Sequence, residues 1–210
     1  MLQEQLSLAV QKGKAKDVAA LVEEGLAGGE TAQALLSGLL DGMGVIGEKF
    51  KNNEVFVPEV LIAARALSRG TALLKAQLVE EGVEPLGTAV IGTVQGDQHD
   101  IGKNLVKMML EGAGFAVVDL GVDVAPEAFV EAVKEHRPQV LGMSSLLTTT
   151  MGSQKDVVEA LRAAGLREQV KVMVGGAPVT QAFCDEIGAD AYTADAATAA
   201  EVAKAFVTAG

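Results

Sequence analysis

The spacing of apolar residues changes abruptly near residue 85, and this change limits the folds that the chain can adopt. Before it, apolar side chains recur every three or four residues, the period of an amphipathic helix. Short stretches of this kind lie at 2–10 and 18–22, and Pro58 can occupy the first turn of a later helix. The spacing predicts four helices in a small bundle. The two longest stripes are Ala32, Leu36, Leu39, Met43, Ile46 and Phe50, and Val60, Ala64, Leu67, Thr71, Leu74 and Leu78.

After the connector 82–87, short apolar runs alternate with helical patterns. This alternation predicts an α/β fold, a Rossmann-like (flavodoxin-like) five-stranded parallel sheet with helices on both faces. We therefore expect a helical domain over 1–86 and an α/β domain over 87–210. Ligands bind beyond the carboxyl ends of the strands in such sheets, so functional residues should follow the runs. The runs lie at 88–94, 115–120, 140–143, 170–174 and 189–192, with helices beginning near Gly102, Pro126, Gly152, Val179 and Ala196.

Charge and cysteine content disfavour several classes of function. The chain has 28 acidic and 17 basic residues, a net charge of −11, which disfavours a nucleic-acid or anionic-membrane partner. Cys184 is the only cysteine, so an intrachain disulfide is impossible and a Cys-rich metal site is disfavoured. The start lacks a signal-peptide pattern, and no apolar run approaches the ~20 residues that cross a bilayer. We expect a soluble, cytoplasmic protein.

The loop after the first predicted strand contains the most unusual residues of the chain. It is not a P-loop, because Gly96 and Gly102 enclose five residues and Asn104 replaces the required hydroxyl residue. Asp97 and Asp100 would also repel a phosphate. The dinucleotide fingerprint Gly-x-Gly-x-x-Gly is absent as well. ATP, GTP and NAD are therefore disfavoured as ligands.

His99 in this loop lies two residues from Asp97. A neutral imidazole can bind a metal through one nitrogen while its other nitrogen donates a hydrogen bond to a carboxylate. The other histidine, His136, lies at a polar helix end. A zinc site normally needs three or four protein ligands. His99 is thus either a solvent-facing loop residue or the ligand of a metal whose other positions a macrocycle fills.

The pattern Asp97-x-His99-x-x-Gly102, followed by Ser144-x-Leu146 and Gly175-Gly176, resembles the cobalamin-binding signature. The chain resembles, over essentially its whole length, the corrinoid proteins of methylotrophic and O-demethylating methyltransferase systems. It is also similar to the cobalamin module of methionine synthase. The resemblance implies a base-off/His-on cobalamin, in which His99 replaces the cofactor's own dimethylbenzimidazole as the metal ligand below the cobalt. It further implies that Asp97 and Thr150 complete a relay behind His99, Thr150 standing where the family often has serine.

The resemblance also assigns residues to the displaced nucleotide tail of the cofactor. Ser144 would bond the base of the tail, and the glycines would let the backbone approach it closely. The alternatives are an ordinary buried strand end for 143–147 and a plain left-handed turn for the paired glycines. The full set of residues implied to contact the cofactor is Asp97, Gln98, His99, Asp100, Ile101, Gly102, Ser144, Leu146, Thr148, Thr150, Gly175, Gly176, Ala177, Tyr192 and Thr193.

Part of the helical half resembles the cap over the methyl-bearing face of the corrin. By this likeness Phe50, Val57 and Val60 face the methyl group, and the alternative is that all three belong to the core of the bundle. An apolar cap would keep water and solutes from the reactive cobalt. It would have to move aside when a partner docks, with the connector 82–87 as the hinge.

The resemblance implies a corrinoid carrier subunit that is not catalytic alone. It would accept a methyl group on cobalt(I) from a substrate-specific methyltransferase and pass it to a second methyltransferase that serves a pterin (tetrahydrofolate) or thiol acceptor. A reductive activase is a third expected partner. The alternatives are the small subunit of an adenosylcobalamin mutase, a cobalamin-binding sensor or regulator, and a flavodoxin-like or receiver domain without cobalamin. Methylamines, methanol, quaternary amines and methoxylated aromatics all stay open as methyl donors, because the partner selects the donor.

Overall fold

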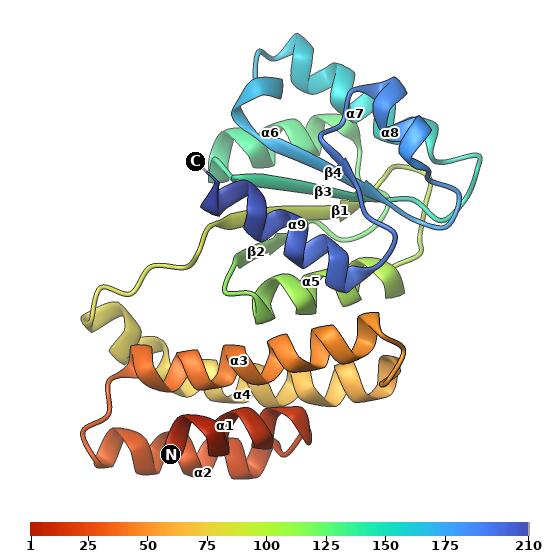
Figure 1. Ribbon diagram of the computed structural model, residues 1–210. Coiled ribbons are helices and arrows are strands. Elements are labelled where there is room, and N and C mark those ends of the chain that lie inside the picture. Colours follow the sequence, from red (N-terminus) through yellow and green to blue (C-terminus); the bar gives the residue numbers. More distant parts are fainter. Residues whose placement is uncertain (210) are drawn as a thin grey trace. The chain divides into compact units, whose positions relative to one another are not determined.

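The computed structural model describes residues 1–209, and the chain divides into two compact units. The first comprises Met1–Pro85 together with Gly112–Gly114, and the second comprises Leu86–Glu111 and the chain from Phe115 onward. Met1–Pro85 contains helices but no strand, whereas the second unit is built on a β-sheet (Figure 1). Over the described residues, no helix combines the length and apolar character needed to cross a membrane.

The first unit contains the four predicted helices. Within it, α1 packs against α3 and α2, and α4 packs against α2 and α3. Pro58 lies in the first turn of α4, where its missing N–H leaves no hydrogen bond unmade. The second helix is longer than the predicted stretch. The bounds are α1 Leu2–Gln11, α2 Ala15–Ala27, α3 Ala32–Lys51 and α4 Val57–Glu80.

The buried face of α3 differs slightly from the predicted stripe. Leu35 is completely buried, whereas Leu36 is only partly buried. Two glycines on the same face explain the difference. A Cβ at Gly38 would lie 2.8 Å from the carbonyl oxygen of Gln3, and a Cβ at Gly42 would lie 2.7 Å from that of Ser7. Small residues one turn apart thus let the backbones of α1 and α3 approach closely, a constraint that an apolar stripe alone does not reveal.

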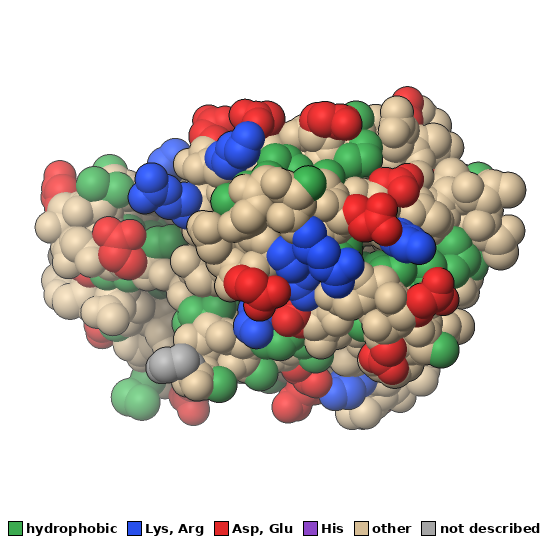
Figure 2. Space-filling model, turned by 90° about the horizontal axis from the view of Figure 1, so that it is seen from above, with side chains coloured by type: hydrophobic (Ala, Val, Ile, Leu, Met, Phe, Trp, Pro, Cys, Tyr) green, Lys and Arg blue, Asp and Glu red, His purple; other side chains and the backbone are tan. Residues whose placement is uncertain are grey.

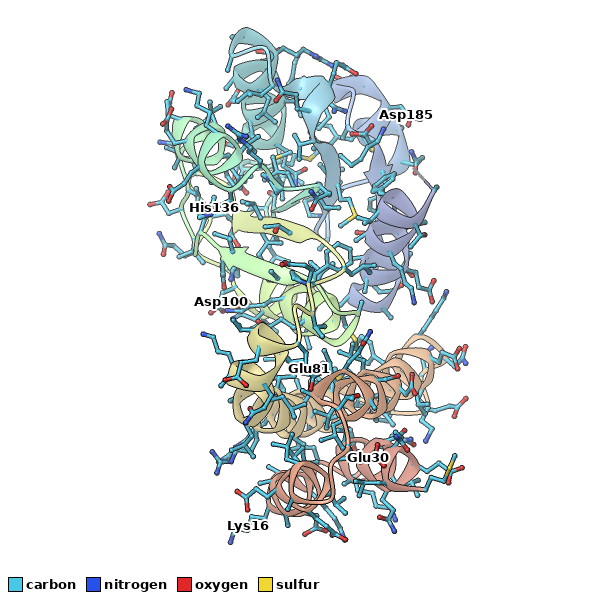
Figure 3. The ribbon with its side chains drawn as sticks, turned by 90° about the vertical axis from the view of Figure 1, so that its left-hand side faces the viewer. Lys16, Glu30, Glu81, Asp100, His136 and Asp185 are labelled. Atoms are coloured by element: carbon cyan, nitrogen blue, oxygen red, sulfur yellow. The ribbon has the colours of Figure 1, made fainter. Side chains whose placement is uncertain are left out.

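The first turn of α3 is capped by a residue that follows α4, the last helix of the bundle. Glu81, directly after α4, accepts hydrogen bonds from the backbone N–H groups of Ala32 at 2.7 Å and Gln33 at 3.1 Å (Figure 3). Thr31 accepts a third, from the N–H of Ala34. These groups have no partner within the helix, and the negative charge of Glu81 also complements the helix dipole. The end of α4 is therefore fixed to the beginning of α3.

The second unit contains one five-stranded, wholly parallel sheet with the order β2-β1-β3-β4-β5. β1 ends one residue before its apolar run, because Val94 forms only an isolated bridge with Val124. The chain turns from β1 to β2 on one side and then crosses to β3 on the other. A crevice for ligands is expected beyond the carboxyl ends of the strands at this switch point. The bounds are β1 Thr88–Thr93, β2 Ala116–Asp119, β3 Val140–Ser144, β4 Lys171–Gly175 and β5 Ala191–Tyr192.

Helices cover both faces of the sheet, α5 and α9 on one face and α6, α7 and α8 on the other (Figure 1). On the second face the completely buried Phe129 packs against β1, and a Cβ at Gly92 would lie 2.8 Å from its ring. Each helix begins within two residues of its predicted start. The bounds are α5 Ile101–Gly112, α6 Pro126–His136, α7 Gly152–Ala163, α8 Gln181–Ile187 and α9 Ala196–Thr208, with a short 3₁₀ helix at Arg167–Gln169.

Charged side chains are mixed on the molecular surface. On the face drawn in Figure 2, Asp and Glu are scattered among Lys and Arg. With the net charge of −11, this mixture provides no broad positive field there to attract a polyanion.

Candidate functional site

The loop between β1 and α5 is folded back on itself around His99. Thr93 Oγ1 donates a hydrogen bond to the carbonyl oxygen of His99 at 2.9 Å. Asp97 Oδ1 accepts the backbone N–H of His99 at 3.0 Å and lies 2.7 Å from His99 Nδ1. The Asp97 side chain is completely buried, whereas that of His99 is 51% exposed. The ring is therefore held through Nδ1, and within residues 1–209 its Nε2 has no hydrogen-bond partner.

The second oxygen of Asp97 is held by the loop after β3. Asp97 Oδ2 accepts hydrogen bonds from Thr150 Oγ1 at 2.7 Å and from the backbone N–H of Leu146 at 2.8 Å. Burial alone raises the pKa of this carboxyl. The hydrogen bonds from Thr150, His99 and Leu146 outweigh it and hold the pKa well below its ordinary value. Asp97 is therefore ionised at neutral pH, which fixes a proton on His99 Nδ1 and leaves a lone pair on Nε2.

Ser145 extends this chain of hydrogen bonds and was not predicted as a site residue. Its side chain is completely buried, and its Oγ lies 2.8 Å from Thr150 Oγ1. Thr150 has one hydroxyl proton, which goes to the carboxylate of Asp97 as the stronger acceptor. Ser145 therefore donates to Thr150. The only signal in the sequence is strand alternation, which puts Ser144 and Ser145 on opposite faces without saying which faces the histidine loop.

The paired glycines after β4 are explained by packing within the protein. Gly176 has φ +126°, and a Cβ there would overlap the carbonyl oxygen of Ser145. A Cβ at Gly175 would lie 3.1 Å from the carbonyl oxygen of Thr193. At Gly102, by contrast, a Cβ would meet no atom within 4 Å. Close approach of a ligand to the backbone stays a prediction at all three glycines.

The other residues predicted to contact a cofactor lie around the same edge of the sheet. Tyr192 packs against the hydrophobic core, and Leu146 takes part through its backbone N–H while its side chain is exposed. Ile101, two residues after His99 in the sequence, is 72% exposed. By exposure the set divides into Gln98, Asp100, Ile101, Leu146, Thr148 and Ala177, which are exposed, Ser144 and Tyr192, which are partly buried, and Thr193, which is buried.

The three residues predicted to cap a cofactor lie in the helical unit and differ in exposure. Val60 is completely buried in the bundle and contributes to its core. Phe50, near the end of α3, and Val57, at the start of α4, are only partly buried. Of the three, Phe50 and Val57 therefore have side-chain surface left for another contact.

A buried ion pair supports the helix that follows the histidine loop, and it was also not predicted. Lys103, in the first turn of α5, is only 4% exposed and lies 2.7 Å from Asp119 at the end of β2. Lys107 lies 3.5 Å from the same carboxylate. Burial raises the pKa of Asp119, but the hydrogen bonds from Lys103 and Gly121 and the charges of both lysines lower it overall. The pair fixes α5, and with it the end of the histidine loop, to the sheet.

The donor set fits a metal that brings most of its own ligands. Among the described residues, no group of three or more His, Cys, Asp or Glu side chains could hold a metal ion. A single exposed imidazole, braced from behind by an ionised carboxylate, could still supply one strong bond to such a metal. Ile101 and Leu146, on or next to the two loops that carry His99 and Thr150, expose apolar side chains that suit the face of a large planar ring.

Family comparisons agree on the class of ligand. A family model for a B12 binding domain matches residues 87–203, and a second model, also for a B12 binding domain, matches residues 2–75. The chain is 45% identical over 205 residues to dimethylamine corrinoid protein 2 of Methanosarcina acetivorans, covering 97% of this chain and 94% of the relative. It is 48% identical over 177 residues to trimethylamine corrinoid protein 1 of the same organism, covering 83% and 82%.

Solved structures resemble the chain over both units. One is a chain of the methanol:cobalamin methyltransferase complex of Methanosarcina barkeri, with a TM-score of 0.90 and 31% identity, covering 100% of this chain and 80% of that one. Another is a cobalamin-binding protein of Desulfitobacterium hafniense DCB-2, with a TM-score of 0.81 and 33% identity, covering 97% and 98%.

Proposed function

Because this chain belongs to the B12-binding corrinoid proteins of methyltransferase systems, we propose that His99 would hold the cobalt of its corrinoid through Nε2. The chain is a corrinoid methyl carrier and works with a partner methyltransferase. When bound, the corrinoid supplies the cobalt that receives the methyl group and gives it up. The observation that supports the assignment is the free, exposed Nε2 of a ring whose Nδ1 is held by buried Asp97.

The hydrogen bonds of Asp97 and Thr150 behind His99 determine which ring nitrogen is free to bind the metal. Asp97 keeps the proton on Nδ1, and Thr150 keeps Asp97 in place. These contacts hold the ring so that Nε2 stays available to a metal.

The helical unit supplies the cap in this proposal. Phe50 and Val57 have side-chain surface left for an apolar contact, whereas Val60 is completely buried in the bundle core. Excluding water and solutes protects a reduced metal centre from oxidation. The connector 82–87 contains no helix or strand and can act as the hinge when a partner needs access.

The partner that loads the carrier acts on a methylated amine in this proposal. The relatives named for dimethylamine and trimethylamine are 45% and 48% identical to this chain, whereas the chain from the methanol system is 31% identical. A second methyltransferase, serving a pterin or thiol, unloads the carrier, and a reductive activase restores cobalt that has been oxidised. Carriers from mutases or regulators fit less well, because the likeness to methylamine corrinoid proteins extends over both units.

Selective isotope labelling tests the ligand directly, because the chain contains only two histidines. The full chain, grown with nitrogen-15 histidine, is loaded with cobalamin and reduced to the cobalt(II) form. Its electron paramagnetic resonance spectrum should show the two-line splitting of an axial nitrogen-15 in place of the three-line splitting of nitrogen-14. The His136→Ala variant is the matched control and should give the same spectrum as the parent. His99→Ala should lose the labelled splitting.

Two results would refute the assignment. One is a three-line splitting from the labelled protein, which would mean that the unlabelled benzimidazole of the cofactor stays on the cobalt. The other is loss of the labelled splitting in His136→Ala with its retention in His99→Ala.

Methyl transfer from mono-, di- and trimethylamine, each with its own partner methyltransferase, tests the class of methyl donor. Methyl transfer with a methanol-specific partner, and with none of the methylamine partners, would exclude a methylated amine as the donor.

A further inference from the structure

Asp123 makes three hydrogen bonds to the histidine loop from the neighbouring loop after β2. Its Oδ1 accepts the backbone N–H of Gly96 at 2.7 Å, and its Oδ2 accepts from Gln98 Nε2 at 3.3 Å. Its own backbone N–H donates to the carbonyl oxygen of Asp97 at 2.9 Å. One residue thus contacts three consecutive residues that lead directly into His99.

The backbone of Asp123 adopts an unfavourable conformation to make these contacts. Its φ is +55°, in the left-handed region, where aspartate and asparagine are tolerated better than other side chains but still less well than glycine. On either side the backbone is fixed to the sheet, because Thr93 donates to Gly121 and Val124 donates to Thr93. The loop after β2 is therefore a firm support from which the carboxylate reaches the histidine loop.

We propose that Asp123 is a positioning residue for the axial ligand, holding residues 96–98 so that the His99 ring presents Nε2 at the place of the cobalt. This inference rests on the proposed role of His99. Asp97 and Thr150 fix the ring from behind, but Asp97 itself stands on a loop whose backbone needs a support. Asp123 supplies that support from a second strand, independently of the contacts that the β3 loop makes.

Substitutions at Asp123 separate the carboxylate from the backbone conformation. Asp123→Gly removes both acceptors but suits the positive φ, so the variant should fold. Asp123→Ala removes the same acceptors and strains the backbone as well. Asp123→Asn keeps an acceptor for the N–H of Gly96 and the tolerance for positive φ. Arg137→Gly is the matched control, because Arg137 has φ +45° and ends α6, before the start of β3.

The first readout needs no cofactor. Hydrogen exchange of the apo protein, measured by mass spectrometry over residues 94–101, should be about three- to tenfold faster in Asp123→Gly and Asp123→Ala, as expected for loss of the hydrogen bond to Gly96. Asp123→Asn and Arg137→Gly should exchange like the parent over this segment. Parent-like exchange in both the Gly and Ala variants would overturn the proposal.

The second readout uses the full chain loaded with methylcobalamin. The visible absorption spectrum gives the ratio of His99-bound to His99-free cofactor, and this ratio should fall roughly tenfold in the Gly and Ala variants and be largely restored in Asp123→Asn. If Asp123→Gly keeps the ratio of the parent, Asp123 acts only through its backbone and the proposal fails. If the parent itself lacks the His99-bound spectrum, the proposed function fails instead, while the apo exchange data still report on Asp123.

Discussion

Thr150 carries a hydroxyl and a methyl group on the same carbon, and it is the hydroxyl that donates to Asp97. Thr150→Val keeps the shape and removes the donor, leaving Asp97 Oδ2 with the N–H of Leu146 as its remaining partner. We expect affinity for the His99-bound corrinoid to fall by about tenfold, a usual loss when a group behind a metal ligand is removed. Titration of apo protein with methylcobalamin measures the affinity. Thr150→Ser should stay close to the parent, and a Val variant that binds equally well would contradict the relay.

At this scale the sequence indicated candidate side chains but not the groups that hold them in place. Asp97 and His99 could be grouped because metal chemistry needs those residue types, whereas Thr150 was assigned only through the resemblance to the corrinoid proteins; the structure places the three side chains in one chain of hydrogen bonds. Ser145 escaped because a serine at a strand end is ordinary. The contribution of Leu146 escaped because it is a backbone N–H, which every residue except proline has. Only the fold reveals which amide points at which oxygen.

The ion pair between Lys103 on α5 and Asp119 on β2 makes a contribution to stability that depends on pH. Asp119 is 20% exposed and Lys103 4%, and hydrogen bonds and lysine charges lower the pKa of Asp119 in the folded state. A carboxyl whose pKa is lowered on folding stabilises the protein above its unfolded pKa of about 3.9, and loses that contribution as the pH falls through the folded value. Asp119→Asn should therefore lower the free energy of unfolding at pH 7 by about 2–4 kcal/mol. The deficit should shrink at acid pH.

Urea unfolding of the parent and the Asp119→Asn variant, at a series of pH values between neutral and strongly acid, measures this difference. Asp156→Asn is a suitable control, because Asp156 is exposed on α7 and removal of an unpaired surface carboxylate should change stability little. If the free energy of unfolding of Asp119→Asn falls short of the parent value by the same amount at every pH, packing rather than charge holds α5 against β2.

Elements were easier to predict than their exact faces. The helical period near 3.6 and the short continuous apolar runs separated helices from strands, and each strand ended close to its predicted limit. The face of α3 was misjudged by one residue at Leu36, because Gly38 and Gly42 turn the helix toward α1. Close backbone approach depends on the partner helix, so no apolar stripe could have indicated it. The end of β1 was also not visible from the sequence, because Val94 pairs in an isolated bridge with Val124, far along the chain in the loop after β2.

At the scale of the whole molecule, the residues proposed to ligate the cobalt and the residues proposed to shield it lie in different units. His99 and its relay belong to the α/β unit, whereas Phe50 and Val57 belong to the helical unit. The sequence indicated this division because the hydrophobic period changes at the connector. A ligand site contained in one unit should bind its metal whatever the other unit does. Shielding, by contrast, must depend on the chain that joins the two.

Lengthening the connector tests metal binding and shielding of the metal separately. Insertion of about twelve Gly and Ser residues between Glu84 and Pro85 lowers the effective concentration of one unit at the other, which falls with roughly the −3/2 power of linker length. We expect the spectrum of bound methylcobalamin to stay unchanged, because every residue that ligates lies after the insertion. The reduced cofactor, however, should be oxidised by dissolved oxygen roughly three- to tenfold faster, as the cap covers it for less of the time.

Stopped-flow absorbance after mixing with aerated buffer measures the oxidation rate. The same inserted residues, appended after Gly210, control for their composition and should leave the rate at that of the parent. Phe50→Ala should raise the rate in the parent but add little in the lengthened chain, because a cap that is mostly displaced has little shielding left to lose. Equal rates in the parent and the lengthened chain would place the shielding of the cobalt in the α/β unit itself and remove the helical unit from that role.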